Sequence, residues 1–191
     1  MSDRFYVCYN IPENDYNKWG DQMADGEVRA TYQQCIAELD RLGIKYTVVD
    51  HPAAETTEQA DHYIEGLEGA RTKTMFLHDK KQRHYLVIMD DRKRMDFKAF
   101  QEISGAKRIS MAKDEEITAE LGLRPGIISP FGLMNNQEKD VQVYIDQMVL
   151  DQPIWTFHPN ENTHTIFLAN QDVLRFIEAH GFSYQVIDLP A

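Results

Sequence analysis

The sequence predicts a single domain of mixed α/β (α+β) architecture, in which short helices flank a mixed, largely antiparallel central sheet. The chain has 191 residues, which is enough for one well-buried domain but tight for two. Short strand patterns are interspersed with short helical patterns, and the runs 71–78 and 84–89 form a clear hairpin. A regular parallel sheet is not indicated, because strands and crossover helices do not alternate strictly.

We expect an N-terminal arm, residues 1–30, followed by the domain itself, residues 31–191. The arm contains a candidate strand, Phe5–Tyr9, but no feature that assigns it a role. Apolar residues then recur at helical spacing over 31–43, with a glycine at the helix end, and the β-branched run 44–49 reads as a strand.

A second helix is predicted to begin at Thr56, since Thr followed three residues later by Gln59 is a capping-box signature. The hairpin comes next. Alternation in its first strand places Thr72, Thr74, Phe76 and His78 on one face and Lys73, Met75 and Leu77 on the other. Its second strand is almost continuously apolar, which predicts a central, buried position.

The same patterns predict the remaining elements. They are a helix over 96–105 capped by Asp96, a short strand over 108–111, a helix over 114–121, a Gly/Pro-rich loop over 123–132, strands over 141–145, 153–157 and 164–168, a helix that ends at Gly181, and a strand over 184–187.

The net charge of −11 argues against general nucleic-acid binding, for which a basic surface is expected. The charge is unevenly distributed, however. Residues 71–124 hold 13 of the 20 Lys and Arg residues against nine acids, a local excess of about four positive charges. This segment is either an ordinary solvated face of mixed charge or a local patch for a polyanion, and the linear sequence leaves both interpretations open.

The chain carries no sign of secretion or membrane insertion. Two cysteines suit a reducing compartment, and the sequence lacks both an 18-residue apolar run and a signal peptide. We therefore expect a cytoplasmic protein with no membrane and no DNA partner. Cys35 falls on the apolar stripe of its helix and is expected in the core.

Standard catalytic motifs are absent, including the nucleophile elbow, the P-loop and the zinc-protease helix. Lys73 is the most unusual residue, because it shares a strand face with two apolar side chains. It is either a strand-end lysine that reaches water or a cation directed into a partly apolar cleft, where its charge would act strongly on an anion or an ester carbonyl.

Two further segments have both a structural and a functional interpretation. His158, which precedes a proline, either satisfies a local turn or faces a ligand together with Asn162 and Thr163. The glycines of the 126–132 loop either form turns or let backbone N–H groups approach a ligand oxygen. The histidines show no familiar metal-ligand spacing, so no metal site is expected.

Three motifs in this order resemble the YbaK/ProX aminoacyl-tRNA editing domains, and among them the freestanding prolyl-tRNA deacylases. They are Thr72-Lys73-Thr74-Met75-Phe76-Leu77, then Gly122-Leu123-Arg124-Pro125-Gly126-Ile127-Ile128-Ser129-Pro130-Phe131-Gly132, then His158-Pro159-x-x-Asn162-Thr163-x-Thr165. His51-Pro52 and Thr57-Glu58 upstream also fit, so that the resemblance covers roughly residues 31–190.

The resemblance implies a trans-editing deacylase that hydrolyses the ester of mischarged tRNA, most often Ala-tRNA(Pro), by substrate-assisted water attack without metal, cofactor or covalent intermediate. It implies that Lys73 is the catalytic residue. The substrate-binding residues that it implies are His51, Thr57, Thr74, Gly126, Ser129, Pro130, Phe131, Gly132, His158, Asn162 and Thr163. The implied partners are the 3′ aminoacyl-adenosine end of a tRNA and an aminoacyl-tRNA synthetase.

The residue after the lysine is asparagine in many prolyl-tRNA deacylases, whereas this chain has Thr74, which leaves the preferred amino acid open. An alternative function is a non-catalytic module that binds an amino acid or a tRNA end, as a regulatory or synthetase-associated factor. The acidic composition and the unmatched arm favour that alternative, and the intact lysine and loop motifs favour the enzyme.

Overall fold

A computed structural model describes residues 6–8 and 30–190 of the chain. The strands in these segments are β1 (Tyr6–Cys8), β2 (Tyr46–Asp50), β3 (Ala70–His78), β4 (His84–Asp90), β5 (Ser110–Met111), β6 (Gln142–Asp146), β7 (Ile154–Phe157), β8 (His164–Ala169) and β9 (Tyr184–Ile187). The helices are α1 (Tyr32–Arg41), α2 (Thr57–Tyr63), α3 (Phe97–Ser104), α4 (Asp114–Leu121), α5 (Gln147–Leu150), α6 (Asn170–Ala179) and the 3-10 helix η1 (Pro130–Asn135).

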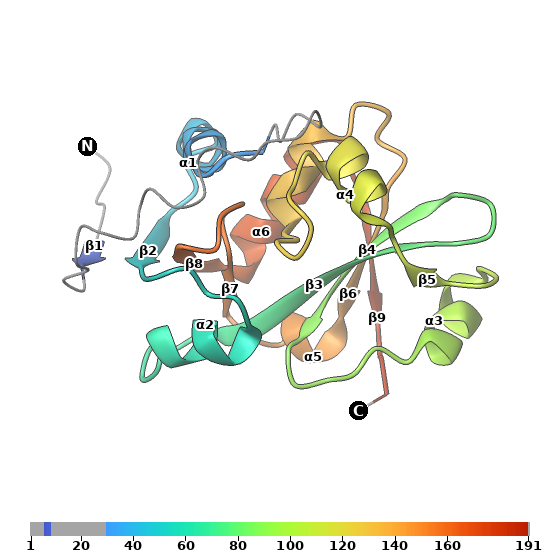
Figure 1. Ribbon diagram of the computed structural model, residues 1–191, viewed down its shortest axis with the longest axis horizontal. Coiled ribbons are helices and arrows are strands. Elements are labelled where there is room, and N and C mark those ends of the chain that lie inside the picture. The colour runs from blue at the N-terminus through green and yellow to red at the C-terminus, as the bar shows by residue number, and fades with distance from the viewer. Residues whose placement is uncertain (1–5, 9–29, 191) are drawn as a thin grey trace.

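The described strands form one sheet in the order β1-β2-β8-β7-β3-β4-β6-β9, and β5 pairs with β3 (Figure 1). Within the described part of the chain four ladders are parallel and four are antiparallel. The predicted mixed α+β class is therefore confirmed, with antiparallel pairing in half of the ladders.

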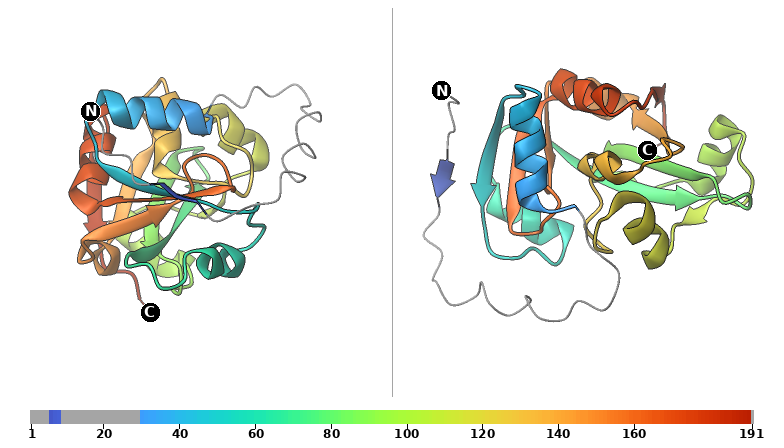
Figure 2. Two further views of the ribbon diagram at one scale, coloured as in Figure 1. Left: turned by 90° about the vertical axis from the view of Figure 1, so that its left-hand side faces the viewer. Right: turned by 90° about the horizontal axis from the view of Figure 1, so that it is seen from above.

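Helices cover both faces of the sheet (Figure 2). In β4, Leu86 and Ile88 pack into the large core formed with α1, α4, α6 and η1, whereas Val87 and Met89 pack into a smaller core with α3. On the α2 side, Ile64 packs against residues of β2 and β8. This two-sided burial is why every residue of β4 is buried, as its apolar run predicts.

The alternation predicted for β3 is confirmed. Phe76 packs into the large core, and Leu77 packs on the opposite face with Met75 beside it. Lys73 lies on the same face as Met75 and Leu77 by strand periodicity. The face of a residue in this strand thus follows directly from its sequence position.

Most helix boundaries also match the prediction. Thr31 caps α1 with a full capping box, and Asp96 accepts hydrogen bonds from two backbone N–H groups of α3. Thr56 caps α2, but Gln59 bonds the Glu55 N–H instead of closing the box.

Some features of the chain differ from the predicted pattern or fall outside the description. Helix α2 ends at Tyr63, a turn earlier than the apolar spacing suggests, and α5 and η1 are not predicted. Part of the candidate strand Phe5–Tyr9 forms β1, which pairs in parallel with β2. The rest of the arm, 1–5 and 9–29, lies outside the described residues.

One edge of β3 is open in the middle of the strand. On the side opposite β4, β3 pairs with β7 only at Ala70 and Arg71 and with β5 only at Leu77 and His78. Residues 72–76 therefore have no strand partner on that side among the described strands. The sheet divides here, and the divergence of β3 from β7 makes room for a cavity.

Candidate functional site

A cavity of about 440 Å³ lies where β3 and β7 separate. This volume falls in the range usual for small-molecule sites. Its walls come from residues within 54–64 at α2, from 72–74 of β3, from 126–128, from 156–158, and from Asn162 and Thr165. Segments far apart in the sequence thus meet at one site.

The Lys73 side chain is held by backbone carbonyls at the cavity. Its Nζ donates to the Asp91 carbonyl at 3.0 Å and to the Lys93 carbonyl, both in the turn after β4. An ammonium group has three N–H donors, so one remains for a ligand. Burial lowers the pKa of Lys73, and the nearby carboxylates of Asp91 and Asp90 oppose that shift and favour the cation.

Threonine hydroxyls fix the point where the two strands diverge. The Thr72 hydroxyl donates to the Thr156 carbonyl, and the Thr156 hydroxyl donates to the Ala70 carbonyl at 2.9 Å. The Thr74 hydroxyl, in contrast, is buried without a hydrogen-bond partner among the described residues. Because an unsatisfied buried hydroxyl costs about 1–3 kcal/mol, Thr74 is suited to a ligand that restores a hydrogen bond.

His158 presents a hydrogen-bond acceptor at the cavity. Its Nδ1 lies 2.9 Å from the His164 carbonyl, which can only accept, so Nδ1 carries the proton. Burial lowers the pKa of His158 and outweighs the opposing effect of that carbonyl, which favours the neutral ring. In the neutral ring with Nδ1–H, Nε2 is an acceptor.

His51 acts on the cavity through Thr165. The His51 Nδ1 donates to the Pro52 carbonyl at 2.8 Å, and its Nε2 therefore accepts from the Thr165 hydroxyl at 2.9 Å. Burial lowers the pKa of His51, which favours this neutral tautomer. Since the hydroxyl proton of Thr165 is committed to His51, Thr165 can offer only lone pairs to a ligand.

Acidic side chains lie beside Lys73. Asp61 lines the cavity and pairs with Arg71 at 3.6 Å. Burial, together with the hydrogen bond and the charge of Asp61, raises the pKa of Asp91 to about 6. The Asp91 backbone carbonyl is one of the two that hold Lys73, so this perturbed carboxyl belongs to the same residue that anchors the lysine.

The structure brings together part of the predicted site. Six predicted residues line the cavity: Thr57, Lys73, Thr74, Gly126, His158 and Asn162. His51 lies one hydrogen bond behind it. The other predicted residues do not line the cavity; they are Ser129, Pro130, Phe131, Gly132 and Thr163.

The 129–132 segment packs into the core instead. Phe131 is fully buried between Phe157 and Phe176, in edge-to-face contacts. The Ser129 hydroxyl donates to the Asn160 side chain and accepts from the Phe131 N–H. The Gly132 N–H bonds the Ser129 carbonyl, so these amide groups serve the loop rather than a ligand.

Thr163 also serves the structure of its turn. Its carbonyl accepts the His51 N–H at 2.9 Å, and its hydroxyl bonds the His164 ring at 2.8 Å. Asn162, which does line the cavity, connects the same turn to Ala54. Its side-chain amide donates to the Ala54 carbonyl, and its backbone carbonyl accepts from the Ala54 N–H. The turn and the start of α2 are thereby joined.

Other lining residues were not predicted as site residues, although several stand within the motifs quoted above. Thr72, Thr156 and Thr165 are ordinary strand formers, and Asp61 falls on a predicted helix where an exposed acid is common. Ile127 and Ile128 add the apolar part of the wall. The three-dimensional arrangement of strands, helix α2 and the 126–128 loop places these residues at one cavity.

Gly132→Ala is expected to destabilise the protein by about 1–3 kcal/mol. An added Cβ would lie 2.7 Å from Leu123 Cδ1 and 3.0 Å from Leu121 Cβ, and both side chains are fully buried. Urea unfolding measures the loss of free energy. Activity per folded molecule should stay near that of the wild type. Wild-type stability combined with lost activity would contradict this packing role.

Among residues 6–8 and 30–190, no group of three His, Cys, Asp or Glu side chains is arranged to hold a metal ion. The described helices include none that is long and apolar enough to cross a membrane.

Comparison with known proteins places the chain in a family. The aminoacyl-tRNA editing domain matches residues 51–176. The chain is 33% identical to the prolyl-tRNA editing protein ProX of Acetoanaerobium sticklandii over 82% of this chain and 96% of that protein. It is 30% identical to prolyl-tRNA synthetase associated domain-containing protein 1 of Mus musculus over 83% of this chain and 95% of that protein.

A solved structure shares the fold. The crystal structure of a proposed trans-editing enzyme for prolyl tRNA synthetase superposes with a TM-score of 0.67 at 19% identity, over 89% of this chain and 99% of that one. The matched segment, 51–176, contains β3, β7 and the residues that line the cavity. The chain therefore belongs to the aminoacyl-tRNA editing domain family.

Proposed function

We propose that the protein is a trans-editing deacylase that hydrolyses the ester of mischarged tRNA, with Ala-tRNA(Pro) as its substrate. The observation that carries the proposal is Lys73, a cation fixed at a cavity by two backbone carbonyls with one N–H donor to spare. Residues 31–191 would form the editing domain. The names of the ProX and synthetase-associated relatives support a role in proline decoding.

The chemistry needs little more than positioning. An aminoacyl ester is already activated, so a fixed cation near its carbonyl or at the terminal phosphate can stabilise the charge of the transition state. Water, helped by the ribose hydroxyl of the substrate, would be the nucleophile. This requires neither a metal nor a side-chain nucleophile, in keeping with the lack of a catalytic triad motif in the sequence.

The acceptors at the cavity suit the amino group of the substrate. A free α-ammonium is a donor only, and His158 Nε2, the Thr165 lone pairs and the Asp61 carboxylate are acceptors at the same cavity. The threonines and the isoleucines of the 126–128 segment would then set the space for the side chain. Discrimination against proline would be steric, through these local contacts.

The proposed partners are the 3′ aminoacyl-adenosine end of the tRNA and prolyl-tRNA synthetase, and the proposed compartment is the cytoplasm, where tRNA is charged. The binding residues would be those at the cavity, namely Thr57, Thr74, Gly126, His158 and Asn162, with His51 in support through Thr165. In this proposal the remaining predicted residues do not contact the substrate but support the walls of the cavity; they are Ser129, Pro130, Phe131, Gly132 and Thr163.

A deacylation panel tests the proposal. We expect the protein to release alanine from Ala-tRNA(Pro) at least tenfold faster than proline from Pro-tRNA(Pro), with cysteinyl- and serinyl-tRNA as further arms. Release of radiolabelled amino acid is the measurement, and a reaction without protein gives the spontaneous rate. Binding of the charged tRNAs without turnover of any of them would identify a non-catalytic binding module instead.

A further inference from the structure

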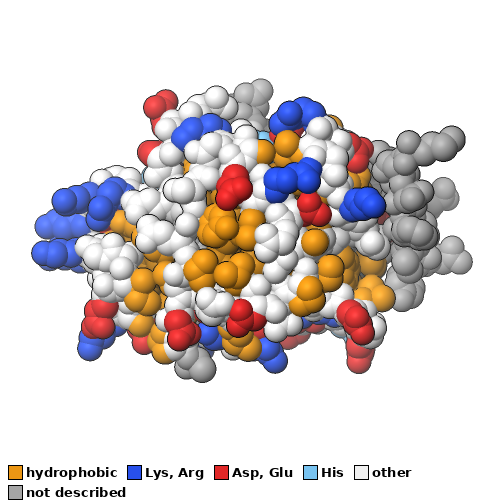
Figure 3. Space-filling model, turned by 180° about the vertical axis from the view of Figure 1, so that it is seen from behind, with side chains coloured by type: hydrophobic (Ala, Val, Ile, Leu, Met, Phe, Trp, Pro, Cys, Tyr) orange, Lys and Arg blue, Asp and Glu red, His pale blue; other side chains and the backbone are white. Residues whose placement is uncertain are grey.

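A basic surface lies at the far end of the β3–β4 hairpin from the cavity. It consists of Lys80, Lys81 and Arg83 in the hairpin turn and of Lys107 and Arg108 in the loop between α3 and β5, and all five are exposed. We call this surface the basic tip. In the space-filling view Lys and Arg side chains gather at this end of the molecule (Figure 3).

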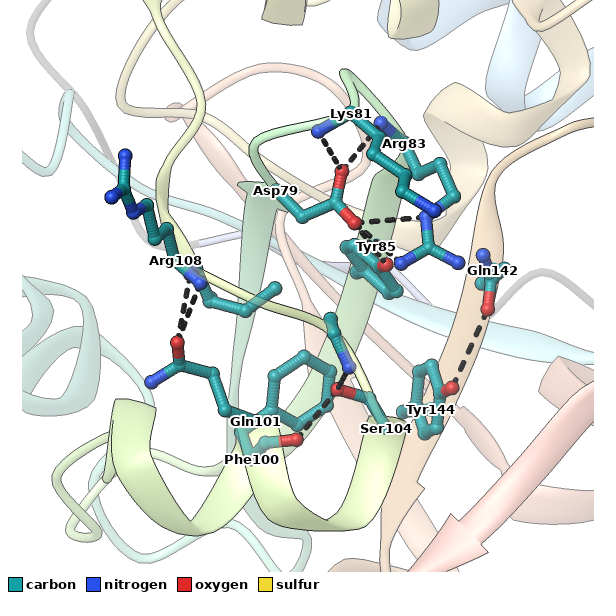
Figure 4. Close-up of polar contacts among 12 residues, drawn as sticks. Asp79, Lys81, Arg83, Tyr85, Phe100, Gln101, Ser104, Arg108, Gln142 and Tyr144 are labelled. Carbon is teal, nitrogen blue, oxygen red and sulfur yellow. Dashed lines mark hydrogen bonds and ion pairs between the residues drawn. The ribbon is translucent and has the colours of Figure 1, made fainter.

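The basic tip is built on a buried carboxylate (Figure 4). Asp79 is 2% exposed, and it accepts hydrogen bonds from the backbone N–H groups of Lys81 and Arg83, from the Arg83 guanidinium and from the Tyr85 hydroxyl. Burial alone would raise the pKa of Asp79, but these hydrogen bonds outweigh it and lower the pKa to about 2. The turn is therefore held in one conformation.

The second loop is fastened to the first. The Lys80 N–H donates to the Lys107 carbonyl at 3.2 Å, and the Arg108 N–H donates to the Gln101 side chain at 2.6 Å. Gln82 and Arg108 both have a left-handed backbone, with φ of 59° and 58°. Such conformations cost energy in residues other than glycine, so the hydrogen bonds of the two adjoining loops must hold this backbone shape against its strain.

The charge of the basic tip is unusual for this protein. It carries five cations and one carboxylate, Asp79, which is already paired with Arg83, on a chain with a net charge of −11. The exposed acids Asp114 and Glu115 begin α4, the next helix along the chain after β5, and they are not part of the tip. A concentrated cluster of this kind on an acidic protein fits the phosphates of a polyanion.

The distance to the cavity selects the kind of polyanion. Lys73 and Lys80 are seven residues apart and Lys80 lies two residues beyond the end of β3, so their separation is at most about 23 Å, the length of seven extended residues. In a stacked nucleic-acid strand that rises about 3.4 Å per nucleotide, this distance spans about seven nucleotides. An RNA whose 3′ end enters the cavity would thus present its first base pairs to the basic tip.

We propose that the basic tip binds backbone phosphates of the acceptor stem of the tRNA whose aminoacylated end occupies the cavity. This inference rests on the proposed function. The contacts are to phosphates, so they would fix the position of the stem without reading its sequence. They would also give an otherwise acidic protein its affinity for RNA.

The test uses Lys80→Glu with Lys107→Glu, which reverses one charge in each loop and leaves Asp79, Arg83 and Gln101 in place. On an alanine-charged RNA minihelix at low salt, kcat/KM is expected to fall at least tenfold. The slope of log kcat/KM against log salt concentration should flatten by about two, because each lost phosphate contact removes about 0.9. On an alanyl ester of adenosine, which lacks the stem, the variant should match the wild type.

A matched control carries the same charge change elsewhere. Lys45→Glu with Lys139→Glu alters two exposed lysines on other segments and should leave the salt slope unchanged. The proposal is overturned if the tip variant keeps the wild-type slope, or if it loses activity equally on both substrates.

A binding measurement separates this proposal from the proposed function. Fluorescence anisotropy with an uncharged minihelix reports RNA binding without catalysis, and we expect the tip variant to bind at least tenfold more weakly. If wild-type protein binds the minihelix through the tip but hydrolyses no charged tRNA, the deacylase proposal fails and the tip proposal stands. If Ala-tRNA(Pro) is hydrolysed but the tip variant binds like wild type, only the tip proposal fails.

Discussion

Lys73→Ala is expected to lower kcat/KM for Ala-tRNA(Pro) by on the order of 10²–10³-fold, the scale for losing one preorganised transition-state contact. The substitution removes the only cation that Asp91 and Lys93 carbonyls hold at the cavity among the described residues. The fold should persist, because the lysine is only partly buried and water can bond both carbonyls in its place. Deacylation kinetics and thermal unfolding measure the two effects.

Two control variants sharpen this test. Lys73→Arg keeps the charge, but a planar guanidinium cannot place its donors as an ammonium does, so most of the activity should still be lost. Lys45→Ala removes an exposed lysine that does not line the cavity, and it should behave as wild type. Near-normal hydrolysis by Lys73→Ala, with a folded protein, would remove Lys73 from the mechanism.

The sequence could predict on which face of β3 the Lys73 side chain lies, because strand periodicity is a local property. Alternation alone places Met75 and Leu77 on the face of Lys73, and both pack there. The continuous apolar run of β4 likewise predicted its burial on both faces. Helix α3 could be placed from its cap, Asp96, and from the glycine that follows its last turn.

The remainder of the candidate site depends on long-range pairing, which leaves no local signal. The cavity exists because β3 separates from β7 after Arg71. The residue that pairs with Arg71, Thr156, lies 85 positions further along the chain, so no local pattern can predict this pairing. Helix α2 brings Asp61 to that opening, and β8 brings Thr165. In the sequence, Gly132 resembles a glycine of a ligand-binding loop. In the structure, the space beside its Cα is instead filled by Leu121, the last residue of α4, and by Leu123.

Asp146→Ala is expected to lower the free energy of unfolding by about 3–5 kcal/mol, the usual cost of removing one partner of a buried ion pair. Asp146 is fully buried, and its Oδ2 lies 2.9 Å from Lys93 Nζ, which is 9% exposed. Without the carboxylate, the Lys93 ammonium would keep, among its described partners, the Leu189 carbonyl at 2.6 Å. Urea unfolding at neutral pH measures the loss.

The apolar double variant Lys93→Met with Asp146→Leu is the control for this prediction. Removing both charges avoids the uncompensated ammonium, so most of the lost stability should return. A second control is Asp151→Ala. The Asp151 carboxylate is exposed, and among the described contacts it accepts a hydrogen bond only from the Gln147 side chain. Its removal should lower the free energy of unfolding by less than about 1 kcal/mol. A cost that small for Asp146→Ala would contradict the buried pair.

The same ion pair connects the stability of the fold with the position of Lys73. The Lys93 carbonyl accepts a hydrogen bond from Lys73, while the Lys93 ammonium is held by Asp146 of β6 and by the Leu189 carbonyl. The ion pair therefore holds the turn after β4 in place, and the backbone carbonyls of that turn hold Lys73. In the double variant we expect stability to recover more fully than kcat/KM, because methionine restores packing but not the anchor of the turn. Equal recovery of both would mean that the pair stabilises the fold without positioning Lys73.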